Sequence, residues 1–388
     1  MPVLAHHLGR TVVAAEPVEV IGPGETWEAL AEIGRSGGHA EPLAGGLIGM
    51  LAYDFGGEIE RLPEPRPYPG GPPAVALGRF ETVAIEDAKG RWQVSSAGCK
   101  KKAAELEKLL DSARQPRTPT LGAGAIASSL PAAAYRKAVQ RARELIRAGD
   151  CYQVNLAARL SSESDASGID VALRLWEAAG PARNAAYVGL PSGTVISASP
   201  ERLLAVHNGV ARTEPIKGTS PLGADPDELM SDKNRAEHVM IVDLMRNDLG
   251  RIARRGGVRV DALMVRRPTP YVDHLVSEVR AELRPSTTVD QIVRAVFPGG
   301  SVTGAPKVRA MEVIHELEPV NRGPAYGSVI AIGTDGSLDA SVSIRTAWLT
   351  EGRVDYWAGG AIVWDSDTEA EFAEAMLKAR PFTAALAP

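Results

Sequence analysis

Hydrophobic and polar residues alternate with a period of two along many short stretches of the chain, as they do in β-strands. We expect strands at residues 12–21, 45–54, 75–80, 83–86, 150–157, 185–190, 195–199, 203–207, 326–332, 338–349 and 354–362. Helices do not alternate strictly with these strands, which argues against a doubly wound parallel sheet. The pattern therefore predicts antiparallel, meandering sheets.

Helical spacing of apolar residues interrupts this β pattern. We expect helices at residues 27–33, 100–113, 131–148, 232–249 and 308–317, and a further helix that carries Glu371 and Glu374. Thr26 is a candidate N-cap of the first helix and Gly34 follows its expected end, and Gly149 follows the expected end of the helix at 131–148. Residues 115–130 are rich in Pro, Gly, Ala and Thr, as linkers often are. We therefore expect an N-terminal subdomain at 1–114, a linker at 115–130 and a catalytic region at 131–388.

Charge and composition narrow the class of protein. The 388 residues carry a net charge of −5 and no long basic block, so we expect no binding to nucleic acid. Neither a signal peptide nor a run of roughly 18 apolar residues is evident, so we expect a soluble, cytoplasmic protein that does not bind a membrane. Cys99 and Cys151 are too few for a disulfide framework and are wrongly spaced for a zinc site.

Two stretches place polar side chains where local sequence leaves their role open. Period-two alternation puts Cys151, Gln153 and Asn155 on one face of a strand, which is either a solvated surface or the wall of a pocket. Glu201 follows Pro200 at a corner between two strands, and local sequence by itself favours a surface turn there.

A lone lysine and three glutamates are candidates for contact with a ligand or a metal ion. Lys217 stands between an apolar residue and a glycine, which is typical of an amine directed at a ligand. Glu371 and Glu374 share one helix face, and Glu237 lies just ahead of the apolar run of another helix. Carboxylates that converge from two helices can hold Mg²⁺ together with an anionic ligand, although such acids are also common on solvated faces.

A glycine-rich loop at residues 297–307 leads into a helix and is more specific. Backbone N–H groups at such a helix start can receive a carboxylate or phosphate, although a plain turn is the alternative. Arg345 stands in an apolar run, where a charge needs a partner such as an anion. Lys378 adds a cation one turn after Glu374, as a ligand contact or as an ordinary i, i+4 pair.

Together, these motifs resemble the chorismate-utilising family over residues 128–380, with further similarity at residues 45–54. The matching segments are 152–156, 199–203, 237–244, 304–307, 344–346, 358–360 and 371–378. The resemblance implies an α+β fold in which two mainly antiparallel sheets pack against each other with flanking helices. Members that add water to chorismate carry a lysine where this chain has Gln153. Lys217, in place of the usual alanine of anthranilate synthases, resembles the aminodeoxychorismate synthase branch.

The resemblance implies that chorismate is aminated at C4, with Glu201 as general acid, Lys217 as covalent nucleophile and His274 near the departing hydroxyl. It implies Mg²⁺ on Glu237 and Glu374, with Glu371 beside them. Asn234 replaces an acid that supports the metal in many relatives. The substrate pocket is expected to include Gln153, Gly218, Thr219, Ser301, Thr303, Gly304, Tyr326, Arg345, Gly359, Gly360 and Lys378.

Ammonia must reach this pocket, yet neither cysteine stands in a glutaminase-like setting. We therefore expect a separate glutamine amidotransferase subunit as a heterodimer partner that supplies ammonia from glutamine. The alternatives are anthranilate synthase component I, isochorismate synthase, which Gln153 disfavours, and a catalytically inactive regulatory subunit.

Overall fold

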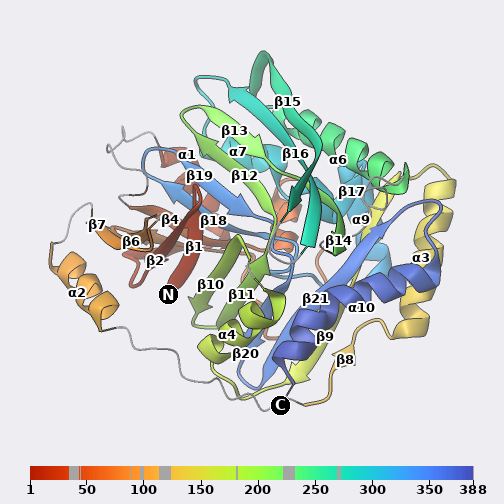
Figure 1. The fold of residues 1–388 in the computed structure, drawn as a ribbon, viewed down its shortest axis with the longest axis horizontal. Coiled ribbons are helices and arrows are strands. Elements are labelled where there is room, and N and C mark those ends of the chain that lie inside the picture. Colours follow the sequence, from red (N-terminus) through yellow and green to blue (C-terminus); the bar gives the residue numbers. More distant parts are fainter. Residues whose placement is uncertain are drawn as a thin grey trace.

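The computed structural model describes residues 1–34, 43, 45–87, 89–96, 100–112, 124–180, 182–221, 232–268 and 272–387. Of residues 219–221, 232–234, 268, 272 and 273 it describes the backbone alone. Within these residues the chain forms two large sheets whose strand pairs are antiparallel, with helices around them (Figure 1). This architecture confirms the expected α+β class.

The first sheet contains eleven strands among the described residues. In spatial order these are β17 (Gly304–Ala305), β9 (Gln153–Glu163), β21 (Arg353–Ile362), β20 (Thr346–Thr350), β11 (Gly193–Ser199), β10 (Asn184–Leu190), β1 (Val3–His7), β2 (Arg10–Ala14), β6 (Thr82–Glu86) and β7 (Trp92–Ser96), and β8 (Ala127–Ser128) pairs with β9. The longest pairing joins β9 to β21, from Val154 opposite Ile362 to Glu163 opposite Arg353.

The second sheet contains ten described strands. Their order is β14 (Ile216–Pro221), β16 (Val272–Leu283), β13 (Val210–Thr213), β12 (Arg202–His207), β19 (Leu338–Ser341), β18 (Ser328–Gly333), β4 (Gly46–Leu51), β5 (Val75–Phe80) and β3 (Glu19–Ile21), and β15 (Ala253–Pro268) pairs with β16. Strands far apart in the sequence are therefore neighbours: β1 pairs with β10 in the first sheet, and β4 pairs with β18 in the second.

Helices cover the outer faces and the rim of the sheets (Figure 1). They are α1 (Thr26–Glu32), α2 (Lys100–Asp111), α3 (Ala132–Arg147), α4 (Gly168–Ala179), α6 (Asp232–Gly250), α7 (Val289–Val296), α8 (Gly300–Thr303), α9 (Lys307–Leu317) and α10 (Thr368–Ala385), with short 3₁₀ turns η1 (Pro23–Glu25) and η2 (Tyr53–Glu58). Among the described residues, no helix combines the length and the apolar character needed to cross a membrane.

A large apolar core joins the two sheets. Val3 and Val188 of the first sheet belong to the same buried cluster as Leu47 and Ile330 of the second. The N-terminal segment thus contributes strands to both sheets and side chains to the shared core. The expected linker at 115–130 lies mostly outside the described residues, and its described end includes β8.

Three local predictions were wrong. Residues 12–21 form two strands, because Glu16 has a φ of 56° directly before Pro17. Residues 338–349 also form two strands, and these belong to different sheets: β19 lies in the second sheet and β20 in the first. Thr26 is the first residue of α1 rather than its N-cap, and its hydroxyl donates to the Gly22 carbonyl at 2.7 Å.

Candidate active site

A bulge in β14 positions Lys217. Lys217 lies opposite Leu275 of β16 and Thr219 lies opposite His274, so Gly218 is an extra residue between two paired positions. Gly218 has a φ of 75°, which a glycine adopts without strain. A bulge of this kind redirects the neighbouring side chain. The Lys217 side chain is half-buried.

The corner between β11 and β12 positions Glu201. The Glu201 carbonyl accepts from the Val342 amide at 3.1 Å, and the Glu201 amide donates to the Ser199 hydroxyl at 3.2 Å. Only 7% of the Glu201 residue is exposed, so the surface turn that local sequence favours was wrong. Its carboxyl lies beside the hydroxyl of Ser301 from α8 and within electrostatic reach of Lys217 and Lys378.

Burial moves the pKa values of these two groups in opposite directions. Loss of hydration lowers the pKa of Lys217 below 10.5; Glu237 and Glu201 oppose this, and Lys378 adds to it. Loss of hydration also raises the pKa of Glu201 above 4.5, although Ser301 and Lys217 oppose it. Both shifts lower the free-energy cost of the neutral form, the amine of Lys217 and the carboxylic acid of Glu201, and these are the forms used in nucleophilic and acid catalysis.

Helix α10 and strand β21 bring three further charged side chains close to one glycine. A Cβ atom at Gly360 would lie 3.4 Å from Glu374 Oε1, 3.5 Å from Glu371 Oε2 and 3.7 Å from Lys378 Nζ, so all three side chains face this glycine. Lys378 Nζ lies 2.7 Å from Glu374 Oε1. Glu371 is buried and accepts from the Ser366 hydroxyl at 2.7 Å. The sequence alternative that this helix merely shows its acids to solvent was wrong for Glu371.

Carboxylates from two helices reach this pocket. Glu237 of α6 and Glu374 of α10 both raise the pKa of Lys217, so both lie within its electrostatic range. In the described part of the chain, no three His, Cys, Asp or Glu side chains gather closely enough to hold a metal ion. Mg²⁺ commonly uses one or two protein carboxylates and completes its shell with water and an anionic substrate. Glu371 and Glu374, whose carboxylates both face Gly360 of β21, fit this preference of Mg²⁺ for one or two protein carboxylates.

The glycine-rich loop forms α8 and β17. Gly304 has a φ of 142°, and a Cβ there would lie 2.1 Å from the Gln153 carbonyl oxygen, so only glycine allows β17 to pair with β9. Thr303 is buried, and its hydroxyl donates to the Gly299 carbonyl at 3.0 Å. Lys307 ends this loop, and its ammonium donates to Asp248 at 2.7 Å. Ser301 is the member of the loop that lies beside Glu201.

Strand β9 presents buried amides, which excludes a solvated face. Gln153 is fully buried, and neither its amide oxygen nor its amide nitrogen has a hydrogen-bond partner in the described structure. Such a group is costly unless a ligand or water satisfies it. The Asn155 side chain interacts with the Tyr326 hydroxyl. Gly359 of β21 packs against β9, where a Cβ would lie 2.0 Å from the Leu156 carbonyl oxygen.

Two non-glycine residues of the expected site have left-handed backbone conformations. The φ of Tyr326 is 63° and that of Arg345 is 50°. Arg345 lies where the chain crosses from β19 to β20, its carbonyl accepts from the Ala198 amide at 3.0 Å, and its charge reaches Tyr356. Strain of this kind is often found at ligand sites.

For the remaining predicted residues, the structure describes fewer side-chain contacts. His274 is largely buried on β16, opposite Thr219 and next to the residue that pairs with Lys217. The side chains of Thr219 and Asn234 lie outside the described part of the chain. His238, which has no role in the sequence prediction, is buried on α6 and approaches the backbone of Lys217.

A buried arginine that local sequence does not reveal lies next to the candidate site. Arg322 donates to both carboxylate oxygens of Glu318, at 2.9 and 2.6 Å, and to the carbonyls of Val302 and Asn155, each at 2.7 Å. Its guanidinium also lies 4.6 Å from the centres of the Tyr53 and Tyr326 rings. These partners are distant in sequence, and the only local signal was a charged residue between a helix and a Gly-Pro turn.

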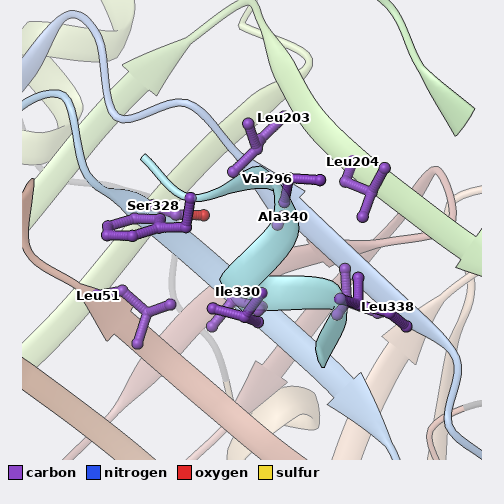
Figure 2. A pocket seen from close by; sticks show the side chains of 11 residues that line it. Leu51, Leu203, Leu204, Val296, Ser328, Ile330, Leu338 and Ala340 are labelled. Carbon is purple, nitrogen blue, oxygen red and sulfur yellow. The ribbon is translucent and has the colours of Figure 1, made fainter. Parts of the chain in front are cut away.

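A small apolar cavity of about 10 Å³ lies apart from this cluster (Figure 2). Aliphatic side chains around β18, β19 and α7 line it, among them Leu204, Ile330 and Leu338. It has room for about one water-sized sphere and almost no polar lining. We regard it as a packing void in the core and not as part of the substrate site.

Comparisons with known proteins agree with this geometry. A profile of the chorismate binding enzyme family matches residues 12–384. The aminodeoxychorismate synthase component 1 of Salmonella typhimurium is 40% identical over 342 residues, which cover 86% of this chain and 75% of that protein. The anthranilate synthase component 1 of Streptomyces coelicolor is 36% identical over 375 residues, with coverages of 89% and 73%.

Among solved structures, anthranilate synthase component I from Streptococcus pneumoniae TIGR4 matches with a TM-score of 0.79 and 28% identity, over 99% of this chain and 90% of that one. The chain therefore belongs to the family of chorismate-binding enzymes. Relatives named aminodeoxychorismate synthase component 1 confirm the predicted resemblance to that branch, and relatives named anthranilate synthase are also present.

Proposed function

We propose that this enzyme replaces the C4 hydroxyl of chorismate with ammonia and forms 4-amino-4-deoxychorismate, the precursor of 4-aminobenzoate for folate. The single observation that carries this proposal is the pair formed by Lys217 and Glu201, whose pKa values are displaced in opposite directions. We expect the reaction to take place in the cytoplasm.

In the proposed mechanism, the neutral amine of Lys217 adds to C2 of the ring. The two conjugated double bonds of the ring shift, and the C4 hydroxyl leaves as water with the proton of Glu201. Ammonia then adds at C4, the two double bonds shift back, and the C2–nitrogen bond to Lys217 breaks. One of the protons released from the two nitrogens restores Glu201, so chorismate and ammonia give the aminated product and water.

Other residues would hold the substrate. Arg345, Lys378 and the N–H groups of the loop at Gly304 supply positive charge for its two carboxylates. Gln153, whose amide has no hydrogen-bond partner among the described residues, would donate to or accept from the ligand. His274 and Tyr326 would line the ring. Gly218 and Gly359 act mainly through the backbone, as a bulge and as a close strand contact.

Mg²⁺ is proposed as the cofactor; Glu237 and Glu374 would hold it, with Glu371 beside them. When bound, it would neutralise the carboxylate on the substrate ring and offset the negative charge of these acids. The chain's own contribution is to orient the glutamates: Ser366 fixes Glu371, and Lys378 pairs with Glu374.

Ammonia is proposed to come from a glutamine amidotransferase subunit. The relatives carry the word component in their names, which supports a second chain. Cys151 is buried and packed among apolar side chains, and burial raises its pKa, so it is not a thiolate nucleophile. Cys99 lies outside the described residues. Free ammonium at high concentration should replace the partner in vitro.

Product analysis tests the proposal. Pure protein is incubated with chorismate, Mg²⁺ and ammonium, and products are identified by mass with and without an added lyase that acts on aminodeoxychorismate. We expect a product that yields 4-aminobenzoate only when the lyase is present. Lys217→Ala should bind chorismate but lose most of this activity, whereas Lys137→Ala on the exposed face of α3 should not.

Anthranilate synthase is the second candidate, because relatives with that name are 36% identical to this chain. Anthranilate formed directly from chorismate and ammonia, at a rate unchanged by Lys217→Ala, would establish the second candidate and overturn the first.

A further inference from the structure

A second cavity lies on the far side of the strand that begins at Arg202. It is open to solvent, has a volume of about 450 Å³, and falls in the size range of small-molecule sites. The β1–β2 turn forms one wall, and the hairpin of β12 and β13 forms the other. Its lining residues are Leu8, Gly9, Arg10, Arg183, Arg202, Ala205, His207, Val210 and Arg212.

Arginine dominates this lining. Ala205 lies directly opposite Arg212 in the β12–β13 pairing, so a small side chain leaves space in front of that guanidinium. Arg183 and Arg212 keep roughly half of their side chains exposed, at 49% and 46%. Arg10 reaches the same cavity from the opposite wall. Three arginines can therefore approach one ligand from different directions.

Glu214 is shared among three arginines, whereas Arg212 pairs with Glu278 at 3.5 Å. Glu214 accepts from Arg183 and Arg267 at 2.7 Å each, and from Arg202 at 2.9 Å. Although burial opposes the shift, these three guanidinium groups lower the pKa of Glu214 to about 2.

Positive charge near the cavity also acts on a neighbouring histidine. Burial, together with the charges of Arg202 and Arg183, lowers the pKa of His6 to about 4. The cavity thus carries several guanidinium groups beside apolar side chains such as Leu8 and Val210, and the guanidinium groups suit a small anionic ligand.

We propose that this arginine pocket, formed by Arg10, Arg183, Arg202 and Arg212, binds a small anion with two or more charges, such as a phosphate or polycarboxylate group. Arg10, Arg183 and Arg212 would contact the anion. Arg202 stays anchored to Asp339, which accepts from its Nε and from a second guanidinium nitrogen at 3.0 Å each.

The pocket adjoins the catalytic strands. Arg202 directly follows Glu201, and Glu214, which binds Arg202, lies three residues before Lys217. An anion that draws Arg183 away from Glu214 would therefore change the surroundings of the Arg202–Glu214 ion pair. That pair joins the segment after Glu201 to the segment before Lys217. The site is separate from the proposed chorismate pocket, and its test does not depend on the proposed reaction.

Calorimetric titration of the full chain with pyrophosphate and, separately, with citrate tests the proposal, without Mg²⁺ and with sodium chloride at matched ionic strength as the reference. We expect saturable binding of one anion per chain, weakened roughly tenfold or more in Arg10→Gln and in Arg212→Gln. Pyrophosphate and citrate distinguish a phosphate preference from a carboxylate preference. Arg259→Gln, a change at an exposed arginine of β15, should leave the affinity unchanged.

Arg345→Gln separates this pocket from the candidate active site and should keep the affinity of the wild-type chain. The proposal is overturned if neither anion binds saturably to the wild-type chain, if Arg10→Gln and Arg212→Gln bind as tightly as wild type, or if Arg345→Gln abolishes binding.

Discussion

At the scale of single residues, the proposed mechanism depends on the protonation states of the Lys217 amine and the Glu201 carboxyl group. Lys217 and Glu201 both lose hydration in the fold, and this loss disfavours the charged form of each. The neutral amine is the form that attacks an electrophile, and the protonated acid is the form that assists a leaving hydroxyl. The same physical cause therefore prepares both partners.

The pH dependence of amination should reflect these two protonation states. The rate requires Lys217 without its extra proton, a fraction that grows with pH, and Glu201 with its proton, a fraction that shrinks with pH. At a constant concentration of unprotonated ammonia, we therefore expect a bell-shaped profile. In Glu201→Gln the rate should fall by roughly 10²- to 10⁴-fold, and the remaining activity should only rise with pH.

Measurement of initial rates between acidic and alkaline pH checks this prediction. Glu107→Gln, a change at an exposed glutamate of α2, is the matched control and should keep the bell-shaped dependence of the rate on pH. If the rate of Glu201→Gln still falls at high pH, the proton for the leaving hydroxyl comes from another group.

At the scale of elements, two adjacent glycines of β21 should behave differently. A Cβ at Gly359 would lie 2.0 Å from a backbone oxygen of β9, whereas a Cβ at Gly360 would meet only side-chain ends at 3.4 Å or more. We expect Gly359→Ala to destabilise the protein by about 1–3 kcal/mol or more, because the strands must separate. Gly360→Ala should leave stability nearly unchanged and slow the reaction, because its methyl group enters the space before Glu374.

Urea unfolding of both variants, together with their rates at saturating chorismate, checks the contrast. Equal stability of the two variants, or an unaffected rate in Gly360→Ala, would contradict the assignment of Gly359 to packing and Gly360 to the site.

The sequence predicted most elements, because alternation and helical spacing report directly which face of an element is buried. It failed where the chain changes sheets. Apolar and polar residues alternate along 338–345 without a break, and nothing local marks Arg345 as the point where the chain passes from one strand to the next. Strand order was also beyond reach, because pairs such as β4 with β18 join residues more than 270 positions apart.

Candidate site residues were found as isolated motifs and depended on a family resemblance for their roles. Local sequence favoured a surface position for Glu201, because a residue after proline at a strand corner is usually exposed. Its burial arises from Val342 and Ser301, which are distant in sequence.

At the scale of the whole molecule, Arg322 connects parts of the chain that fold far apart in sequence. It joins β9, α8 and the turn after α9, and its guanidinium lies between two tyrosines, one of them in the N-terminal segment. Because both Arg322 and Glu318 are buried, removal of one partner leaves an uncompensated charge in the interior.

Arg322→Met should therefore lower the free energy of unfolding by roughly 3–5 kcal/mol. The double variant Arg322→Met with Glu318→Gln should recover part of that loss, because no buried charge is left unpaired. Arg309→Met, which breaks surface pairs with Asp150 and Glu312, should cost only about 0–1 kcal/mol. Chemical denaturation of all three variants checks the order, and an Arg322→Met protein as stable as Arg309→Met would contradict it.

The most direct test of the central claim is the intact mass of the enzyme after brief incubation with chorismate and Mg²⁺ in the absence of ammonia, followed by acid quenching. The account predicts a fraction of enzyme that is heavier by one chorismate less one water, with the added mass on the peptide that contains Lys217, and no such species in Lys217→Ala. An enzyme that aminates chorismate but shows no adduct, or shows the same adduct in Lys217→Ala, would contradict a covalent role for Lys217.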